Sequence, residues 1–249
     1  PIPFAPNDHP PQALDRDGGF HRCEHRVAVE DGRQAGDSAT ATVRPVATAS
    51  DRILEQPLSY WLWQAPFAEA KFAPVLRHND LGAVERVLDV GCGPGTNAAH
   101  FDAADYVGID LNPRYVDDAE RRYGRDFRVA DATEFSVPEG ERFDFILINS
   151  FLHHIPDPPV RELLANLRRA LAPGGHIHIM ELVLPPRPNV GRLLARLDRG
   201  DHARPLQAWR ELLGEHFDAV VFEPYRLGAG WTEATTLWHM VYFKCAAGC

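Results

Sequence analysis

The sequence has little sulfur and few basic residues. Its 249 residues include four cysteines and two methionines, and 26 Lys and Arg compare with 35 Asp and Glu, a net charge of -9. No two cysteines form a CxxC pair, so neither a disulfide framework nor a metal site is predicted. The shortage of positive charge argues against nucleic acid as the main partner, because phosphate binding needs clustered Lys and Arg.

Long apolar runs are also absent. No stretch approaches the roughly 18–20 residues that span a bilayer, and no basic segment followed by an apolar one opens the sequence. Neither a membrane partner nor a signal peptide is therefore predicted, and a reducing, cytoplasmic setting is expected. The length suits one globular domain with an appendage, or at most two small domains.

Aromatic residues are scarce in the first fifth of the chain. Residues 1–50 are rich in Pro, Gly, Ala, Thr and Asp, and Phe4 and Phe20 are their only aromatics. Such a segment buries too little apolar surface to offset its ordering entropy, so a mostly disordered N-terminal extension is predicted. Residues 51–83 are dense in aromatics instead. One or two short helices, interrupted at prolines that include Pro74, are expected there.

After this segment, short apolar strands alternate with helices, a rhythm typical of a parallel sheet with helices on both faces. The expected strands are 86–90, 106–110, 127–130, 143–148 and 176–182. The expected helices are one near 96–101, one from Pro113 to Arg122 with Asn112 as N-cap, and one begun by Pro158, capped by Asp157 and stopped at Pro173–Gly175.

The C-terminal part departs from this alternation. A helix at 206–216 precedes strands at 219–223 and 237–243, and no helix separates these two strands. This order predicts a closing hairpin at the sheet edge with an antiparallel last strand. The fold class predicted is α/β, a Rossmann-like doubly wound sheet within residues 84–249.

The stretch VLDVGCGPGTN, residues 87–97, places three glycines directly after a strand. Gly91, Gly93 and Gly95 are spaced G-x-G-x-G, whereas the dinucleotide-binding fingerprint is G-x-G-x-x-G. Asp89 precedes the loop, where its negative charge would repel a pyrophosphate and would attract an ammonium group. An NAD-dependent oxidoreductase is therefore the disfavoured alternative.

Two further carboxylates end the next strands. Asp110 ends the second strand and is placed to accept both hydroxyls of a ribose, and Asp131 ends the third, where it can accept from an adenine amino group. Ligands of doubly wound sheets bind beyond the carboxyl ends of the strands. The ligand indicated has an amine, a ribose and an adenine and needs no phosphate, a description that S-adenosyl-L-methionine meets.

Five segments, in this order and at these intervals, resemble the motifs of class I S-adenosylmethionine-dependent methyltransferases of the small-molecule type: VLDVGCGPG, VGIDLN, VADATEF, FDFILINSFLHHIPD and LAPGGHIHIMEL. The resemblance covers about residues 84–244. It implies a seven-stranded sheet with a reversed final strand. It also implies an acceptor lid made of a helical segment at 51–83 and an insertion at 185–205.

The resemblance also implies roles for single residues. Asp89 and the backbone of Gly91–Gly95 would hold the methionine end of the cofactor, and Cys92 within that loop is interpreted as a small filler rather than a nucleophile. The other implied cofactor contacts are Asp110 at the ribose with Leu111 beside it, Asp131 and Ala132 at the adenine, and Asn149 and Ser150 beside the sulfonium.

Two histidines are candidate general bases. His153 and His154 follow the fourth strand, in the loop that borders the methyl group in this fold, and imidazole titrates near neutral pH. A base is needed only for a hydroxyl, ammonium or carbon-acid acceptor, and structural packing is the alternative role for either ring. Glu181 is expected to face the acceptor pocket, whereas His176 and His178 are expected to be structural.

The sequence therefore predicts methyl transfer from S-adenosyl-L-methionine to an O, N or C atom of a small-molecule metabolite. Two alternatives stay open. One is an enzyme that uses the same cofactor differently, for example by cyclising it, and the other is a non-catalytic ligand-binding protein. The expected partner is a small-molecule methyl acceptor, and a homodimer is an open alternative to a monomer.

Overall fold

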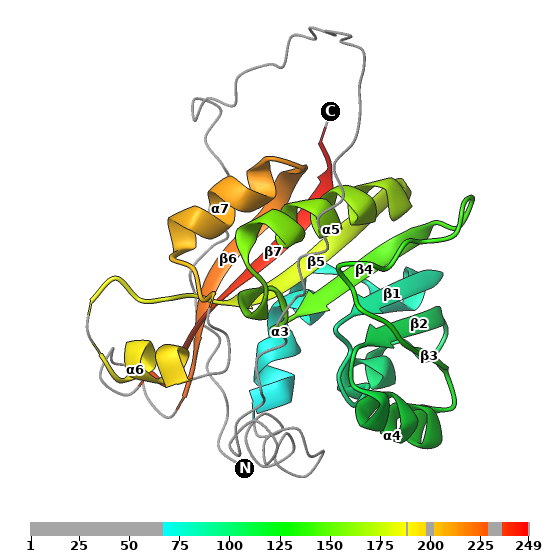
Figure 1. Cartoon of the computed structure of the whole chain (residues 1–249), viewed down its shortest axis with the longest axis horizontal. Helices are drawn as coiled ribbons and strands as arrows, with labels where there is room; N and C mark the ends of the chain where they lie inside the picture. Colours follow the sequence, from blue (N-terminus) through cyan, green and yellow to red (C-terminus); the bar gives the residue numbers. More distant parts are fainter. Residues whose placement is uncertain (1–66, 188, 198–201, 229–235, 249) are drawn as a thin grey trace, which may run out of the picture. The chain divides into compact units, whose positions relative to one another are not determined.

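The computed structural model describes residues 67–187, 189–197, 202–228 and 236–248. The predicted extension at 1–50 and residues 51–66 of the predicted lid lie outside this part. The described chain forms a seven-stranded sheet in the order β3-β2-β1-β4-β5-β7-β6 (Figure 1). Its strands are β1 Arg86–Val90, β2 Asp105–Asp110, β3 Asp126–Val129, β4 Phe143–Asn149, β5 Leu171–Leu182, β6 Phe217–Leu227 and β7 Trp238–Ala247.

Strand directions confirm the predicted α/β class. Strands β1 to β5 pair in parallel, whereas β7 pairs antiparallel with both β5 and β6. The predicted C-terminal hairpin is therefore present, and its second strand lies between β5 and β6. Both hairpin strands are longer than expected.

Helices cover both faces of the sheet (Figure 1). They are α3 Ala68–His78, η2 Leu81–Ala83, η3 Thr96–His100, α4 Pro113–Tyr123, η4 Leu152–His154, α5 Asp157–Ala170, α6 Val190–Leu197 and α7 Leu206–Gly214. Successive strand residues point to opposite faces. Thus Ile146 of β4 packs in the cluster of α5 and α7, and Leu147 packs in the cluster of α3 and α4. Both faces of β4 are buried, as its apolar sequence predicts.

Helix α4 begins as predicted and ends at Tyr123, one residue later than expected. The Asn112 side chain accepts a hydrogen bond from the Arg114 N–H, and Pro113 occupies the first turn. Gly124 closes the helix in the left-handed conformation with φ 61°, which glycine adopts at little cost. This helix follows β2 directly and thereby fixes the carboxyl end of that strand.

The boundaries of α5 differ from the prediction. The N-cap is Pro156 rather than Asp157, because the Asp157 carboxylate accepts a hydrogen bond from Arg204 at 2.8 Å instead. The helix ends at Ala170, and β5 begins immediately with Leu171 paired to Phe143. The register then shifts before β5 pairs again. A Cβ at Gly175 would lie 2.9 Å from the Phe143 carbonyl oxygen, so this glycine permits the close backbone approach.

Two other local predictions need correction. The segment after Gly95 is a five-residue 3₁₀ helix held by i to i+3 bonds, because Phe101 is buried and only four residues then separate η3 from β2. Helix α3 also continues through Pro74, which is itself buried. Packing of Phe72 and Val75 in the core offsets the hydrogen bond that proline cannot donate.

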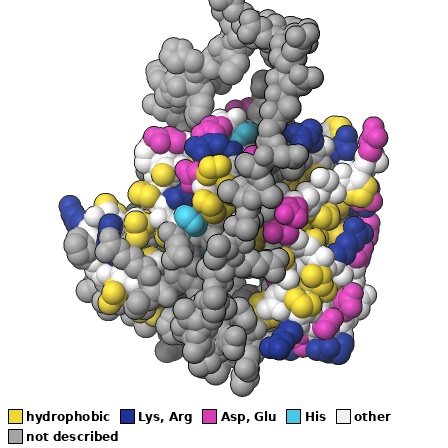
Figure 2. Space-filling view, in the orientation of Figure 1, with side chains coloured by type: hydrophobic (Ala, Val, Ile, Leu, Met, Phe, Trp, Pro, Cys, Tyr) yellow, Lys and Arg dark blue, Asp and Glu magenta, His cyan; other side chains and the backbone are white. Residues whose placement is uncertain are grey.

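The described surface carries charges of both signs. Figure 2 shows acidic and basic side chains interspersed over the described part of one face. None of the helices within the described ranges combines the length and the apolarity that crossing a membrane requires.

Candidate functional site

The glycine loop lies at the carboxyl edge of the sheet, directly after β1. The N–H groups of Gly91 and Cys92 both donate to the Ile109 carbonyl of β2, at 2.9 and 3.0 Å. All three loop glycines have left-handed φ values, 71° at Gly91, 55° at Gly93 and 74° at Gly95. A Cβ on Gly91 would lie 2.5 Å from the ring of Phe151. The loop therefore requires glycine there for both its conformation and its space.

Asp89 is fully buried beneath this loop. Its Oδ2 accepts hydrogen bonds from the Tyr106 hydroxyl at 2.5 Å and from Asn97 Nδ2 at 3.0 Å. Its Oδ1 is buried and has no hydrogen-bond partner in the described part of the chain. Burial raises the pKa of Asp89 to about 6, although its two donors oppose that rise. A buried oxygen without a donor is costly, so this site suits a ligand that donates to it.

Asp110 joins the loop to the end of β2. Its Oδ2 accepts from the Gly93 N–H at 2.9 Å, and its Oδ1 accepts from the Asn112 N–H at 2.8 Å. Burial raises the pKa of this carboxyl, while the two N–H groups lower it. Each carboxylate oxygen keeps a further lone pair for a ligand hydroxyl. The next side chain, Leu111, is 66% exposed.

Asp131 and Ala132 follow β3. Asp131 Oδ1 accepts from the N–H and the hydroxyl of Thr133, at 2.9 and 2.7 Å, so the residue forms a local turn. The Ala132 side chain is buried in the core, and the backbone is the part of this residue left for a ligand. The Cys92 thiol is also buried, which together with nearby Asp89 and Asp110 raises its pKa well above the ordinary value. A protonated, buried thiol agrees with its interpretation as a loop filler.

A chain of polar contacts continues across the end of β4. Asn149 Nδ2 donates to Asn97 Oδ1 at 3.2 Å, and the Ser150 hydroxyl donates to Asn149 Oδ1 at 3.3 Å. Lys71 of α3 donates to the same Ser150 hydroxyl at 3.1 Å. Ser150 has φ 56°, the one left-handed residue other than glycine within the described ranges. Such backbone strain is frequent at functional sites.

The loop that carries the two histidines is fixed from the β5 side by Glu181. Its Oε1 accepts from the N–H groups of Phe151 and Leu152, at 2.9 and 2.6 Å. Its Oε2 lies 2.7 Å from Nδ1 of His153, which is 2% exposed. Burial alone would raise the pKa of Glu181, but His153 and the two N–H groups outweigh it and lower the pKa. The expectation that Glu181 faces the acceptor pocket is therefore wrong, because its carboxylate is fully buried in this loop.

Arg204 fixes the same loop through its carbonyl groups. Its guanidinium donates to the carbonyl oxygens of Leu152 and Ile155, at 3.0 and 2.8 Å, and is itself buried over the Trp209 ring. The loop's backbone is thus held by a carboxylate on one side and a guanidinium on the other. Between them, His153 is buried, and His154 is exposed with its ring centre 4.1 Å from that of His153.

Part of this chain is similar in sequence to known methyltransferases. Residues 87–175 match the family model described as a methyltransferase domain. A demethylmenaquinone methyltransferase of Clavibacter sepedonicus is 36% identical over 137 residues, 53% of this chain and 51% of the relative. A 27-O-demethylrifamycin SV methyltransferase of Amycolatopsis mediterranei is 34% identical over 118 residues, 43% of this chain and 42% of the relative. The chain thus spans about half the length of these relatives.

A solved structure confirms the architecture. The N-methyltransferase NodS of Bradyrhizobium japonicum, in complex with S-adenosylhomocysteine, superposes with a TM-score of 0.59 at 22% identity, over 78% of this chain and 95% of NodS. The sheet order and the antiparallel β7 agree with the fold that the sequence motifs imply. Residues 87–175 therefore form a methyltransferase domain with the class I fold, and the cofactor of this class is S-adenosyl-L-methionine.

In this methyltransferase domain the predicted cofactor residues lie at the carboxyl ends of neighbouring strands. Asp89 is the last but one residue of β1, which the glycine loop follows, Asp110 ends β2, Asp131 follows β3, and Asn149 ends β4. Contacts join the first, second and fourth of these, through Gly93 and Asn97. No group of three potential metal-ligating side chains occurs in the residues that the structure describes.

Four residues of this region were not predicted. Tyr106 and Asn97 orient Asp89, Lys71 reaches Ser150, and Arg204 holds the histidine loop. A hydroxyl within the otherwise apolar second strand was the available signal for Tyr106. Asn97 lies eight residues from Asp89 within the glycine stretch, whereas Lys71 and Arg204 act over separations in sequence that no local pattern reveals.

Proposed function

We propose that this methyltransferase moves a methyl group from S-adenosyl-L-methionine to an O, N or C atom of a small-molecule metabolite. The observation that carries the proposal is Asp89 Oδ1, a buried oxygen without a partner among the described residues, beneath the glycine loop. Such an oxygen suits the ammonium group of a methionine moiety and would disfavour a pyrophosphate.

The remaining contacts support the same cofactor. Asp110 has lone pairs left for ribose hydroxyls, and Asp131 Oδ2 makes no hydrogen bond to the described residues and suits an adenine amino group. Leu111 and Val129 expose apolar surface at the same ends of β2 and β3. The cofactor supplies an activated methyl group on a sulfonium, and the part of this chain is to position an acceptor and exclude water.

For acceptors that need a base, we assign that role to His154 and a supporting role to His153. His154 is exposed beside the ends of β4 and β5, whereas the ring of His153 is buried against Glu181. A general base contributes about 10²- to 10⁴-fold to a rate. His154→Gln should therefore lower kcat by that order for a hydroxyl acceptor, while leaving the affinity for S-adenosylhomocysteine unchanged.

Small-molecule acceptors are supported by the relatives. Those compared above are named for demethylmenaquinone and for 27-O-demethylrifamycin SV, and the proposal extends this class of acceptor to the present chain. The helical segment before β1 and the segment at 185–205 are proposed to form the acceptor lid. Lys71, which contacts Ser150 from α3, is the described residue that connects the first of these segments to the site.

The test is a screen of the full chain against metabolite pools with S-adenosylmethionine labelled on its methyl group. Label in an acceptor, together with S-adenosylhomocysteine, supports methyl transfer. Methylthioadenosine formed from the cofactor alone would instead indicate cyclisation, and binding without turnover in every pool would indicate a ligand-binding protein. Calorimetry with S-adenosylhomocysteine tests the crevice itself, and binding of NADH in its place would overturn the proposal.

A further inference from the structure

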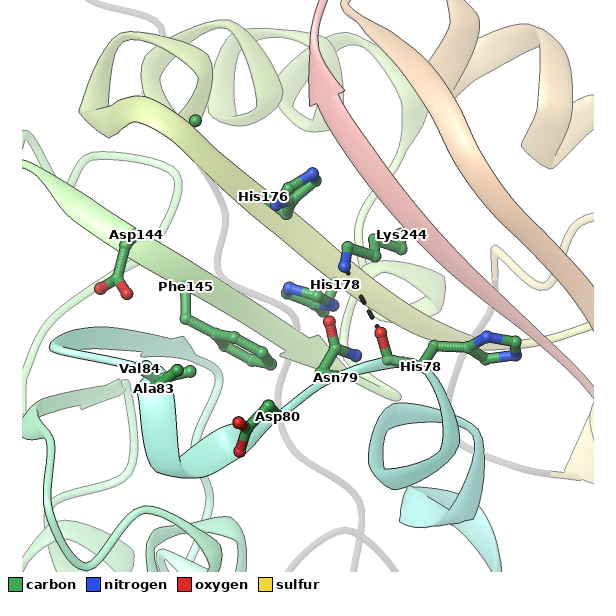
Figure 3. A pocket seen from close by; sticks show the side chains of 11 residues that line it. His78, Asn79, Asp80, Ala83, Val84, Asp144, Phe145, His176, His178 and Lys244 are labelled. Atoms are coloured by element: carbon green, nitrogen blue, oxygen red, sulfur yellow. Dashed lines mark hydrogen bonds between the residues drawn. The ribbon is translucent and has the colours of Figure 1, made fainter.

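A cavity lies away from the glycine loop, at the amino ends of the parallel strands. Its volume is about 220 Å³. Figure 3 shows it on the α3 side of the sheet, between the segment that leads into β1 and the strands β4, β5 and β7. The polar groups that matter here are Asn79, Asp80, Asp144, His176, His178 and Lys244.

His178 presents a hydrogen-bond donor at this cavity. The side chain is 1% exposed, and its Nδ1 lies 3.0 Å from the hydroxyl of Tyr242. Asn79 Nδ2 donates to that hydroxyl at 3.0 Å and to the Val75 carbonyl at 2.8 Å. Because the hydroxyl accepts from Asn79, its own hydrogen is available for His178 Nδ1. The neutral ring then carries its proton on Nε2, which donates to no described residue.

Lys244 and His176 add two more donors. Lys244 is one of only two lysines in the sequence, and its Nζ reaches the His78 carbonyl at a long 3.4 Å. His176 makes no hydrogen bond to the described residues and contacts the ring of His178. Burial is the main cause that lowers the pKa of both histidines, and the nearby charge of Lys244 lowers it further. The cavity thus holds one ammonium group beside two histidine rings that can donate hydrogen bonds.

The carboxylates of the lining have other partners. Asp144 accepts from the N–H groups of Glu85 and Arg86, at 3.0 and 2.6 Å, and Asp80 accepts from the Gly82 N–H at 3.1 Å. In Figure 3, Asp144 and Asp80 lie apart from the cluster of Lys244 and the two histidines. Glu223 is paired with His78 at 2.8 Å. Within the described ranges, no carboxylate forms an ion pair with Lys244.

We propose that His176, His178 and Lys244 form a binding site for a small oxyanion, a carboxylate or a phosphate, separate from the cofactor crevice. The anion would accept from the His178 Nε2–H and from the Lys244 ammonium, and its charge would compensate the half-buried charge of Lys244. The cavity is smaller than the roughly 300–1,000 Å³ of sites for drug-sized ligands, so the ligand is a compact anion rather than a nucleotide.

The test follows the histidine rings of the full chain, labelled with ¹⁵N, by long-range ¹H–¹⁵N spectra. Sodium phosphate and sodium succinate are titrated separately at constant ionic strength set with sodium chloride. Saturable shifts of the His176 and His178 rings are expected, with a rise of the His176 pKa in the bound state. A response to phosphate and a response to succinate each support the site, and their ratio identifies the type of anion.

Two variants separate this site from general charge effects. Lys244→Gln should weaken the binding of the anion by about tenfold or more, the scale of a hydrogen bond to a charged group. Arg121→Gln removes one positive charge from a side chain that is 70% exposed on α4, and its anion affinity should match that of the wild type. His176→Gln replaces Lys244→Gln if the latter does not fold. The absence of saturable shifts with both anions, or equal affinities in pocket and control variants, would overturn the proposal.

Discussion

The Tyr106 hydroxyl lies 2.5 Å from Asp89 Oδ2, and together with Asn97 it occupies that one oxygen of the buried carboxylate. Both donors are neutral. Asn97 is an amide, and burial raises the pKa of Tyr106 well above its ordinary value. They hold the carboxylate in place without neutralising it. The negative charge of Asp89 therefore stays available to a cation at the glycine loop.

This arrangement predicts that cofactor binding weakens in mild acid. Burial raises the pKa of Asp89 from 3.8 to about 6, whereas an ammonium group beside it favours the ionised form. Below about pH 6 binding must first remove a proton from Asp89, so the dissociation constant of S-adenosylhomocysteine should rise by up to about tenfold per pH unit. Calorimetry between about pH 8 and about pH 5 measures this slope.

Asp89→Asn provides the control for that experiment. The amide has nearly the same shape but does not titrate, so its weaker binding should not change with pH. A wild type whose affinity is the same over the whole range would show that Asp89 does not contact the ammonium group.

Asp110→Ala should weaken the binding of S-adenosylhomocysteine by roughly 1.5–3 kcal/mol, the scale of hydrogen bonds to a charged group. The variant removes the acceptor proposed for the ribose hydroxyls and also the contact to the Gly93 N–H. Asp117→Ala is the matched control, since Asp117 is exposed on α4. Equal affinities of the two variants by calorimetry would remove Asp110 from the site.

Gly91→Ala should destabilise the fold by about 1–3 kcal/mol more than Gly124→Ala, the usual cost of overpacking. Both glycines have left-handed φ values, 71° and 61°. A Cβ at Gly91 meets the Phe151 ring at 2.5 Å, whereas one at Gly124 meets nothing within 4 Å. The difference in the free energy of unfolding, measured with guanidinium chloride, thus isolates the contact between the glycine loop and the histidine loop. Equal losses in the two variants would contradict it.

Local patterns predicted most of the fold. The apolar residues on both faces of β4 indicate a buried parallel strand, and Asn112 with Pro113 marks the start of α4 because both act within one helical turn. Each strand of the parallel part was therefore expected within a few residues of its place, apart from the earlier start of β5. The order of the motifs also predicts the position of the cofactor crevice, since ligands of such sheets bind beyond the strand ends.

Long-range contacts account for what was not predicted. Aspartate is a common N-cap residue, but the carboxylate of Asp157 accepts a hydrogen bond from Arg204, 47 positions away in the sequence. Glu181 ends a strand at the edge that binds ligands, yet its carboxylate is bound by N–H groups 29 and 30 positions away. In the first case a buried guanidinium and in the second a buried carboxylate binds partners that are distant in the sequence, so neither contact is visible in the neighbouring residues.

Glu181→Gln should lower the free energy of unfolding by about 1–3 kcal/mol at about pH 7, because it removes charge-assisted bonds to His153 and to the histidine loop. The pKa of Glu181 is lowered in the folded protein from its ordinary 4.5. Its contribution to stability is therefore complete above about pH 4.5 and is lost as the pH falls through the folded pKa. Guanidinium unfolding at several pH values measures both effects.

Glu162→Gln is the control for this prediction, since Glu162 is exposed on α5 and its loss should change the free energy of unfolding little. The Glu181 variant should also show a weaker loss of stability in acid than the wild type, because it lacks the group whose protonation is unfavourable in the folded state. If both variants followed the wild type at every pH, packing alone would hold the loop. His153 would then have no electrostatic support from Glu181, and the supporting role proposed for it behind His154 would fail.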